Sequence, residues 1–146
     1  MGMYTGLRFK GVVKEELRKD FGPIAWEGDW GWIEDEKFQE FSKDYRASFI
    51  PMGGLCYMPD NWDEDEEFER TYDEETGQWV FQCSLKNYSQ TIEAFLELVP
   101  YFMESVEHCE VLYEEWAWST GYELMGDKMV ETKEKFICYY DNAQCE

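Results

Sequence analysis

The sequence has little positive charge. Lysine and arginine together number 13 in a chain of 146 residues, against 33 aspartates and glutamates, and the formal net charge is −20. A small domain needs a net charge of only about 2–8 to stay soluble. Because this excess repels phosphate groups and anionic lipids, we expect neither direct nucleic-acid binding nor binding to a membrane surface.

Histidine and catalytic motifs are also scarce. His108 is the only histidine, and the sequence contains no P-loop, no Rossmann glycine motif, no nucleophile elbow and no zinc-protease helix motif. Carboxylate pairs arise by chance among 33 acidic side chains, so they indicate no particular chemistry. We therefore predict a protein that is not an enzyme, with no catalytic residues and no cofactor.

Paired cysteines and long apolar runs are absent as well. The five cysteines form an odd set without a C-x-x-C pair: Cys56, Cys83, Cys109, Cys138 and Cys145. This usage predicts reduced, mostly buried thiols. No run approaches the roughly 20 apolar residues of a membrane span, and the first residues lack the apolar region of a signal peptide. The expected location is the cytoplasm.

Apolar residues are abundant enough for one core. They make up 44% of the chain, and aromatic residues make up 18%. Alternation of apolar and polar residues predicts strands, and spacing of three or four predicts helices. The predicted strands span residues 4–13, 78–86, 109–118, 120–124, 128–132 and 135–140. The predicted helices span residues 14–21, 34–45 and 89–107, the last capped by Asn87 or Ser89 and kinked or divided at Pro100.

Two segments are less regular. Residues 24–33 predict a connection whose three tryptophans cover one edge of the core, and residues 48–58, interrupted by proline and glycine, predict an edge or bulged strand. Together the elements predict a single α+β domain over residues 1–146, with a mostly antiparallel sheet and two or three helices packed on one face.

Charge is segregated along the chain. The first twenty residues are weakly basic and contain five cations: Arg8, Lys10, Lys14, Arg18 and Lys19. Residues 60–75 are strongly acidic, and we expect them to be exposed because buried, unpaired carboxylates are costly. This segment contributes nine candidate partner-binding residues: Asp60, Trp62, Asp63, Glu64, Asp65, Glu66, Glu67, Phe68 and Glu69. Aromatic residues among acids are typical of an interface for a basic protein, although a merely solubilising loop would have the same composition.

A second acidic array is predicted on the helix at 89–107. Glu93, Glu97, Glu104 and Glu107 fall on the face opposite the core, and no lysine or arginine lies between residues 87 and 127. A row of negative charge on a rigid element can imitate a phosphate backbone. These four residues complete the predicted partner-binding set.

Metal binding is not favoured. Asp63, Asp65, Glu67 and Glu74 have partial EF-hand spacing, but Phe68 stands where the loop requires glycine. His108 and Cys109 are adjacent, so on a strand they would point to opposite faces and could not both hold zinc easily. We expect His108 to mark the end of the long helix instead.

In size, net charge, reduced cysteines and its two acidic arrays, the chain resembles the acidic inhibitors that phages direct against restriction and CRISPR nucleases. The resemblance implies a DNA-mimic surface, an anti-defence role in the host cytoplasm, and a basic nuclease or other nucleic-acid-binding protein as partner.

Three alternatives stay open from the sequence. One is an acidic domain of a larger assembly with no inhibitory role. An immunity protein that neutralises a basic nuclease toxin would use the same physics. A protein that sequesters a nucleotide in an aromatic pocket would need the cations near the start of the chain to hold the phosphate.

Overall fold

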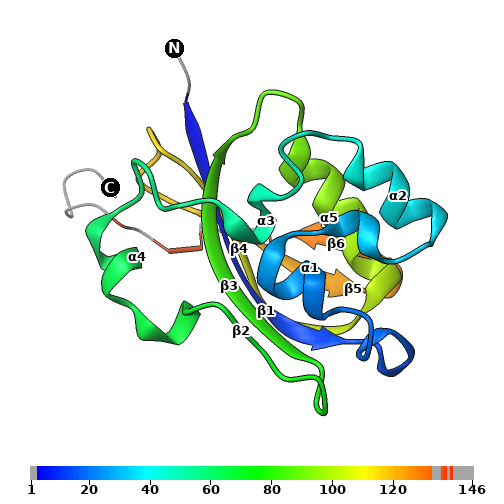
Figure 1. Ribbon diagram of the computed structural model, residues 1–146. Coiled ribbons are helices and arrows are strands. Elements are labelled where there is room, and N and C mark those ends of the chain that lie inside the picture. Colours follow the sequence, from blue (N-terminus) through cyan, green and yellow to red (C-terminus); the bar gives the residue numbers. More distant parts are fainter. Residues whose placement is uncertain (1–2, 133–135, 138, 140–146) are drawn as a thin grey trace.

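The protein folds around one antiparallel sheet. Its structure is a computed structural model that describes residues 3–132, 136, 137 and 139, without the side chains of Asp63 and Glu64. The strands are β1 (Tyr4–Val13), β2 (Thr71–Tyr72), β3 (Gln78–Lys86), β4 (Met103–Tyr113), β5 (Thr120–Met125) and β6 (Lys128–Glu131). Their order in the sheet is β2-β3-β1-β4-β5-β6, and every neighbouring pair is antiparallel (Figure 1). The predicted α+β class is confirmed.

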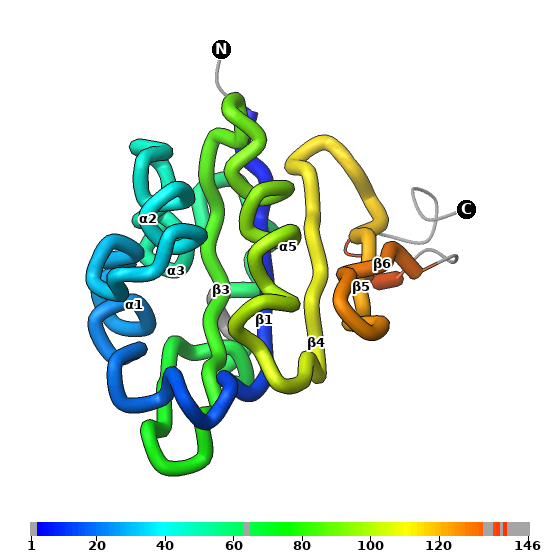
Figure 2. Tube along the Cα trace, turned by 90° about the vertical axis from the view of Figure 1, so that its right-hand side faces the viewer, coloured from blue at the N-terminus to red at the C-terminus, as the bar shows by residue number. Residues whose placement is uncertain are grey.

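Short helices cover both faces of this sheet. The α-helices are α1 (Gly22–Glu27), α2 (Glu36–Ser42), α3 (Phe49–Met52), α4 (Asp60–Glu64) and α5 (Thr91–Phe102), and three 3-10 turns span Glu15–Leu17, Trp30–Trp32 and Glu66–Phe68. Four of them, α1, α2, α3 and α5, lie on one face, which we call the helical face (Figures 1 and 2). The segment containing α4 lies on the opposite face, which we call the second face.

The main core lies between the sheet and the helical face. Alternation directs Leu7 and Phe9 of β1 toward the helices, and their antiparallel partners Cys83 and Phe81 of β3 point the same way. On α5, apolar residues at helical spacing pack onto them, and Phe95 contacts Phe9 with ring centroids 5.4 Å apart. These two periodicities are what made the strands at 4–13 and 78–86 and the hairpin at 120–132 predictable.

The predicted helix at 89–107 is wrong in its last five residues, 103–107. It ends at Phe102, two residues after Pro100, and the chain continues directly into β4. The reason is tertiary: Met103 pairs with Val13, and the following residues form a ladder along β1. His108 is therefore in a strand and does not mark a helix end. The N-cap of α5 is Gln90, whose side chain makes no capping hydrogen bond, so the prediction of Asn87 or Ser89 as the cap is wrong; the Asn87 side chain nevertheless accepts a hydrogen bond from the Ile92 amide in the first turn.

Other boundaries also differ from the predictions. Residues 48–58 contain helix α3 in place of an edge strand. Their hydrogen bonds to β3 come from Ser84, whose amide donates to the Gly54 carbonyl and whose hydroxyl donates to the carbonyls of Gly54 and Cys56. Residues 24–33 place one tryptophan, Trp30, in the core and leave the other two exposed. The predicted strand at 135–140 lies partly outside the described residues.

Candidate partner-binding surface

Two cations of β1 lie on the second face. Because side chains alternate along a strand, Arg8 and Lys10 point away from the helices that cover Leu7 and Phe9. Arg8 is flanked in the sheet by Gln82 of β3, whose side-chain oxygen accepts a hydrogen bond from the Arg8 Nε at 3.0 Å. Unpaired cations at the centre of a sheet would be costly to bury, so this face requires negative partners.

The acidic segment supplies those partners. Asp65 Oδ2 lies 3.2 Å from Arg8 Nη1, and Glu67 Oε1 lies 2.8 Å from Lys10 Nζ. The Arg8 guanidinium also lies over two rings, with Cζ 4.4 Å from the Trp62 ring centroid and 4.6 Å from that of Phe68. We call these six residues, Arg8, Lys10, Trp62, Asp65, Glu67 and Phe68, the Arg8–Lys10 cluster.

Burial in this cluster corrects part of the predicted site. Trp62 is fully buried and Phe68 is 4% exposed, so neither is an anchor for a partner. Only 6% of the Arg8 side chain is exposed, while Glu67 remains 65% exposed. The prediction that the whole segment is exposed is therefore wrong: its aromatic residues are bound within the molecule by cation–π contacts and packing, and its outer carboxylates face water.

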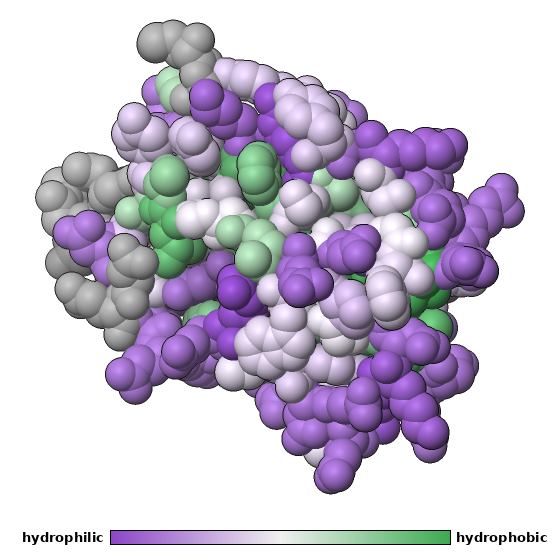
Figure 3. All heavy atoms as spheres, in the orientation of Figure 1, coloured by the Kyte–Doolittle hydropathy of each residue, from purple (hydrophilic) through white to green (hydrophobic). Residues whose placement is uncertain are grey.

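The remaining acids of the segment do face outward. Asp60, Glu66 and Glu69 are exposed, and among the described residues none of them forms an ion pair. Figure 3, in the orientation of Figure 1, shows strongly hydrophilic side chains along the lower and right margins around a less polar central area. The side chains of Asp63 and Glu64, also predicted for this site, lie outside the described residues.

The second acidic array is divided between two elements. Glu104 and Glu107 are on β4, where Glu104 lies 3.9 Å from Arg18 and Glu107 lies 3.6 Å from Lys10. Glu107 and Glu67 thus share one lysine, and the two predicted arrays meet there. Glu93 and Glu97 are exposed on α5, on the helical face. The structure does not form the single helical row of four carboxylates that the sequence predicted.

A buried carboxylate lies next to the cluster. Glu110 of β4 is fully buried and accepts hydrogen bonds from His108 Nε2 and the Tyr139 hydroxyl, each at 2.7 Å. Burial raises the pKa of Glu110, but the hydrogen bonds from His108, Tyr139 and Ser119 outweigh it and hold this pKa below its ordinary value. His108 packs on Phe68, with ring centroids 4.8 Å apart. These contacts stabilise the second face.

The described residues form no metal centre, and two of their three cysteines are buried. They contain no cluster of three His, Cys, Asp or Glu side chains able to hold a metal ion. Asp65 and Glu67, two members of the partial EF-hand pattern, are directed to Arg8 and Lys10 instead. Burial raises the pKa of the Cys83 and Cys109 thiols, which disfavours the reactive thiolate. Cys56 is exposed, and the other two cysteines lie outside the described residues.

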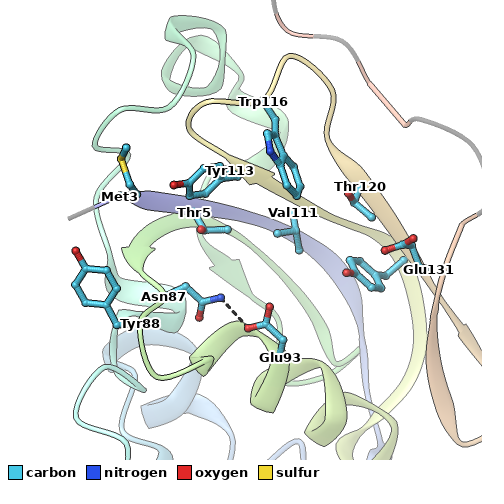
Figure 4. Close-up of a pocket in the computed structure, with 11 residues that line it drawn as sticks. Met3, Thr5, Asn87, Tyr88, Glu93, Val111, Tyr113, Trp116, Thr120 and Glu131 are labelled. Atoms are coloured by element: carbon cyan, nitrogen blue, oxygen red, sulfur yellow. Dashed lines mark hydrogen bonds between the residues drawn. The ribbon is translucent and has the colours of Figure 1, made fainter. Parts of the chain in front are cut away.

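An open pocket lies on the helical face, where α5 leaves the β4–β5 part of the sheet uncovered (Figure 4). Its volume is about 460 Å³, within the range of small-ligand pockets. We call it the aromatic pocket, after four of the residues that line it: Tyr88, Tyr113, Trp116 and Tyr122. Glu93 of the predicted site and Glu131 of β6 also line it, and sequence reasoning missed every one of its residues except Glu93.

The sheet register forms one wall of this pocket. Thr5 pairs with Tyr113, Val111 with Thr120, and Tyr122 with Glu131, so cross-strand neighbours present one face together. Figure 4 shows Tyr113 and Trp116 on one side, Asn87 and Glu93 on the other, and sheet residues between them. Alternation within residues 109–124 could have indicated that the aromatic residues share one face of a sheet. The pairing of β5 with β6 and the position of α5 depend on tertiary contacts, so the sequence did not indicate the pocket itself.

The nucleotide alternative loses most of its cations. Of the five basic residues near the start of the chain, Arg8, Lys10 and Arg18 already form ion pairs with carboxylates. A phosphate bound there would have to break those pairs.

Within the described residues, no helix has the length and apolar character needed to cross a bilayer.

Comparison of the chain with protein-family models, curated proteins and solved structures gives no match.

Proposed function

We propose that this chain is a binding protein that engages a basic, nucleic-acid-handling protein through its carboxylate surface and blocks that protein's nucleic-acid site. The observation that carries the proposal is the placement of charge. Arg8, Lys10 and Arg18 are turned inward to carboxylates, whereas Asp60, Glu66 and Glu69 face water without an ion pair among the described residues. Such a surface attracts cationic proteins over about a Debye length, roughly 8 Å at physiological salt.

The supported mechanism is steric and electrostatic. Glu67 and Glu107 on the second face remain exposed while each forms an ion pair with Lys10, which restricts the positions of both carboxylates before binding. A cationic groove that normally receives phosphates would meet them with little loss of conformational freedom. An anti-defence role and an immunity role both fit this mechanism, and they differ only in the identity of the partner.

The test compares the parent chain with a charge variant. The variant Asp60→Asn, Glu66→Gln, Glu69→Gln removes three unpaired carboxylates and leaves Asp65 and Glu67 in the Arg8–Lys10 cluster. The matched control carries the same charge change at exposed positions elsewhere: Asp20→Asn, Glu27→Gln, Glu34→Gln. Each chain is immobilised, incubated with cell lysate at low salt, and eluted with a salt gradient or with duplex DNA.

We expect the parent and the control to retain basic nucleic-acid-binding proteins that duplex DNA displaces, and we expect the variant to release them at lower salt. A purified captured protein should lose nucleic-acid binding when the parent chain is added. The proposal fails if the variant and the control elute at the same salt, or if the captured protein binds nucleic acid equally well with and without the chain.

A further inference from the structure

The aromatic pocket has a composition that selects cations. Aromatic rings present a negative face, and Tyr113 and Trp116 stand edge to face with centroids 5.6 Å apart. Trp116 is 52% exposed, so part of its indole ring is accessible to a ligand in the pocket. No lysine or arginine among the described residues lines the pocket.

Two carboxylates converge on the same space. Glu131 is the cross-strand partner of Tyr122, and both Glu131 and Glu93 act on the Tyr122 hydroxyl: its pKa is raised by burial first and then by these two negative charges. Asn87 Nδ2 donates a hydrogen bond to Glu93 Oε1 at 2.7 Å and so orients that carboxylate. These two carboxylates disfavour an anionic ligand and favour a cation with an apolar or planar body.

We propose that the aromatic pocket, which lies on the opposite face of the sheet from the carboxylates of the second face, binds the guanidinium group of an arginine side chain on a part of the basic partner that extends around the sheet to the helical face; this inference rests on the proposed function. A guanidinium is planar, weakly hydrated and able to stack on a ring while it forms paired hydrogen bonds with a carboxylate. The chain itself uses this chemistry: Arg8 lies between two rings, and Arg46 lies over Tyr45 and Tyr88, with Cζ 4.3 and 5.4 Å from their centroids. Tyr113, Trp116 and Tyr122 remain for the incoming group.

The direct test needs no partner protein. Nα-acetyl-arginine N-methylamide is titrated into the ¹⁵N-labelled chain and followed by two-dimensional NMR, with the neutral citrulline analogue and the lysine analogue titrated in parallel. We expect saturable shifts of the Trp116 indole signal with the arginine probe, and no saturation with citrulline. Equal binding of the citrulline probe would refute the proposal, and equal binding of the lysine probe would refute the assignment to a guanidinium.

Variants locate the binding. Glu93→Gln combined with Glu131→Gln should weaken the arginine probe about tenfold, the effect of losing charge-assisted hydrogen bonds. Trp116→Ala should weaken binding of the arginine probe by a similar factor, and in this variant the NMR signal of Tyr122 reports binding. The control Glu27→Gln with Glu123→Gln removes the same charge from exposed residues outside the pocket and should bind as the parent does. Unchanged affinity in the first two variants would place the probe elsewhere and overturn the inference.

The two proposals fail in different ways. If the arginine probe binds the pocket but no basic protein is captured, the proposed function fails and the pocket assignment stands. If a basic protein is captured equally by the parent and by the Glu93→Gln, Glu131→Gln variant, the proposed function stands and an arginine in this pocket is not part of the interface.

Discussion

Arg8 is the residue on which the second face depends. A buried guanidinium in the middle strand of a three-strand ladder needs both a counter-charge and a packing surface, and Asp65, Trp62 and Phe68 provide them. The local sequence carried part of this signal, since Arg8 and Lys10 share one face of a predicted strand. Nothing in the sequence paired them with residues more than fifty positions away.

Asp65→Asn should lower the free energy of unfolding by about 3 kcal/mol, because it leaves the buried Arg8 guanidinium without its counter-charge. Arg8→Met should cost less, about 1 kcal/mol, because the Asp65 carboxylate that it leaves unpaired is one-third exposed. Urea unfolding of both single variants and the double variant measures the coupling, which we expect to be at least about 0.5 kcal/mol. Strictly additive effects would show that the two side chains do not interact.

Glu110 gives the second face a dependence on pH. Its pKa is held below the ordinary value of 4.5, so the folded state keeps the carboxylate charged where the unfolded chain would take up a proton. The unfolded state thus binds more protons, and the contribution of Glu110 to stability is complete above pH 4.5 and is lost as pH falls through the folded-state pKa.

Glu110→Gln should therefore flatten the fall in stability below pH 4.5 and should cost about 2 kcal/mol at pH 7, where its charge-assisted hydrogen bonds are lost. Chemical unfolding at a series of pH values measures both effects. Glu123→Gln, at an exposed position of β5, is the control and should leave the profile unchanged. If the Glu110→Gln variant shows the same dependence of stability on pH as the parent chain, Glu110 is not the source of that dependence.

At the scale of elements, what the sequence could predict follows from how local each signal is. Strands β1 and β3 were predictable because apolar and polar residues alternate along each of them. The β5–β6 hairpin was predictable because a glycine turn lies between two short alternating segments. The transition from α5 to β4 was not, because the apolar spacing around Met103 and Val106 suits a helix and pairing with β1 decides otherwise. For the same reason Glu104 and Glu107 were assigned to the wrong element.

The contact between α4 and the sheet also depends on one glycine. A Cβ on Gly6 of β1 would lie 2.8 Å from Cζ3 of Trp62 and would also meet Met58 Sδ. Gly6→Ala should therefore displace the α4 segment and destabilise the fold by about 1–3 kcal/mol, the usual effect of overpacking.

Urea unfolding and acrylamide quenching of tryptophan fluorescence measure this displacement, since Trp62 should become accessible. Gly22→Ala is the matched control, because a Cβ at Gly22 meets nothing within 4 Å. If the Gly6 variant leaves quenching and stability as they are in the parent, the α4 segment is not held against β1 in the way described.

At the scale of the whole molecule, the fold separates charge. Arg8 and Lys10 of β1 are covered by the acidic segment, and the exposed side of that segment consists largely of carboxylates. The surface is therefore more negative than the net charge of −20, spread evenly, would make it. That arrangement favours encounter with cationic proteins and also stores repulsion among the exposed carboxylates.

Added salt should therefore stabilise the folded chain. Raising NaCl from low to about 0.5 M screens repulsion among exposed carboxylates more than it weakens the buried Arg8 pair, and we expect a gain of about 1 kcal/mol, or a few degrees in melting temperature. The variant Asp60→Asn, Glu66→Gln, Glu69→Gln should show a smaller gain, and comparing the two slopes by calorimetry cancels salt effects that both chains share. A melting temperature that falls as salt is added would mean that attractive ion pairs outweigh repulsion among the exposed carboxylates. A cationic partner would then gain no stability by relieving that repulsion.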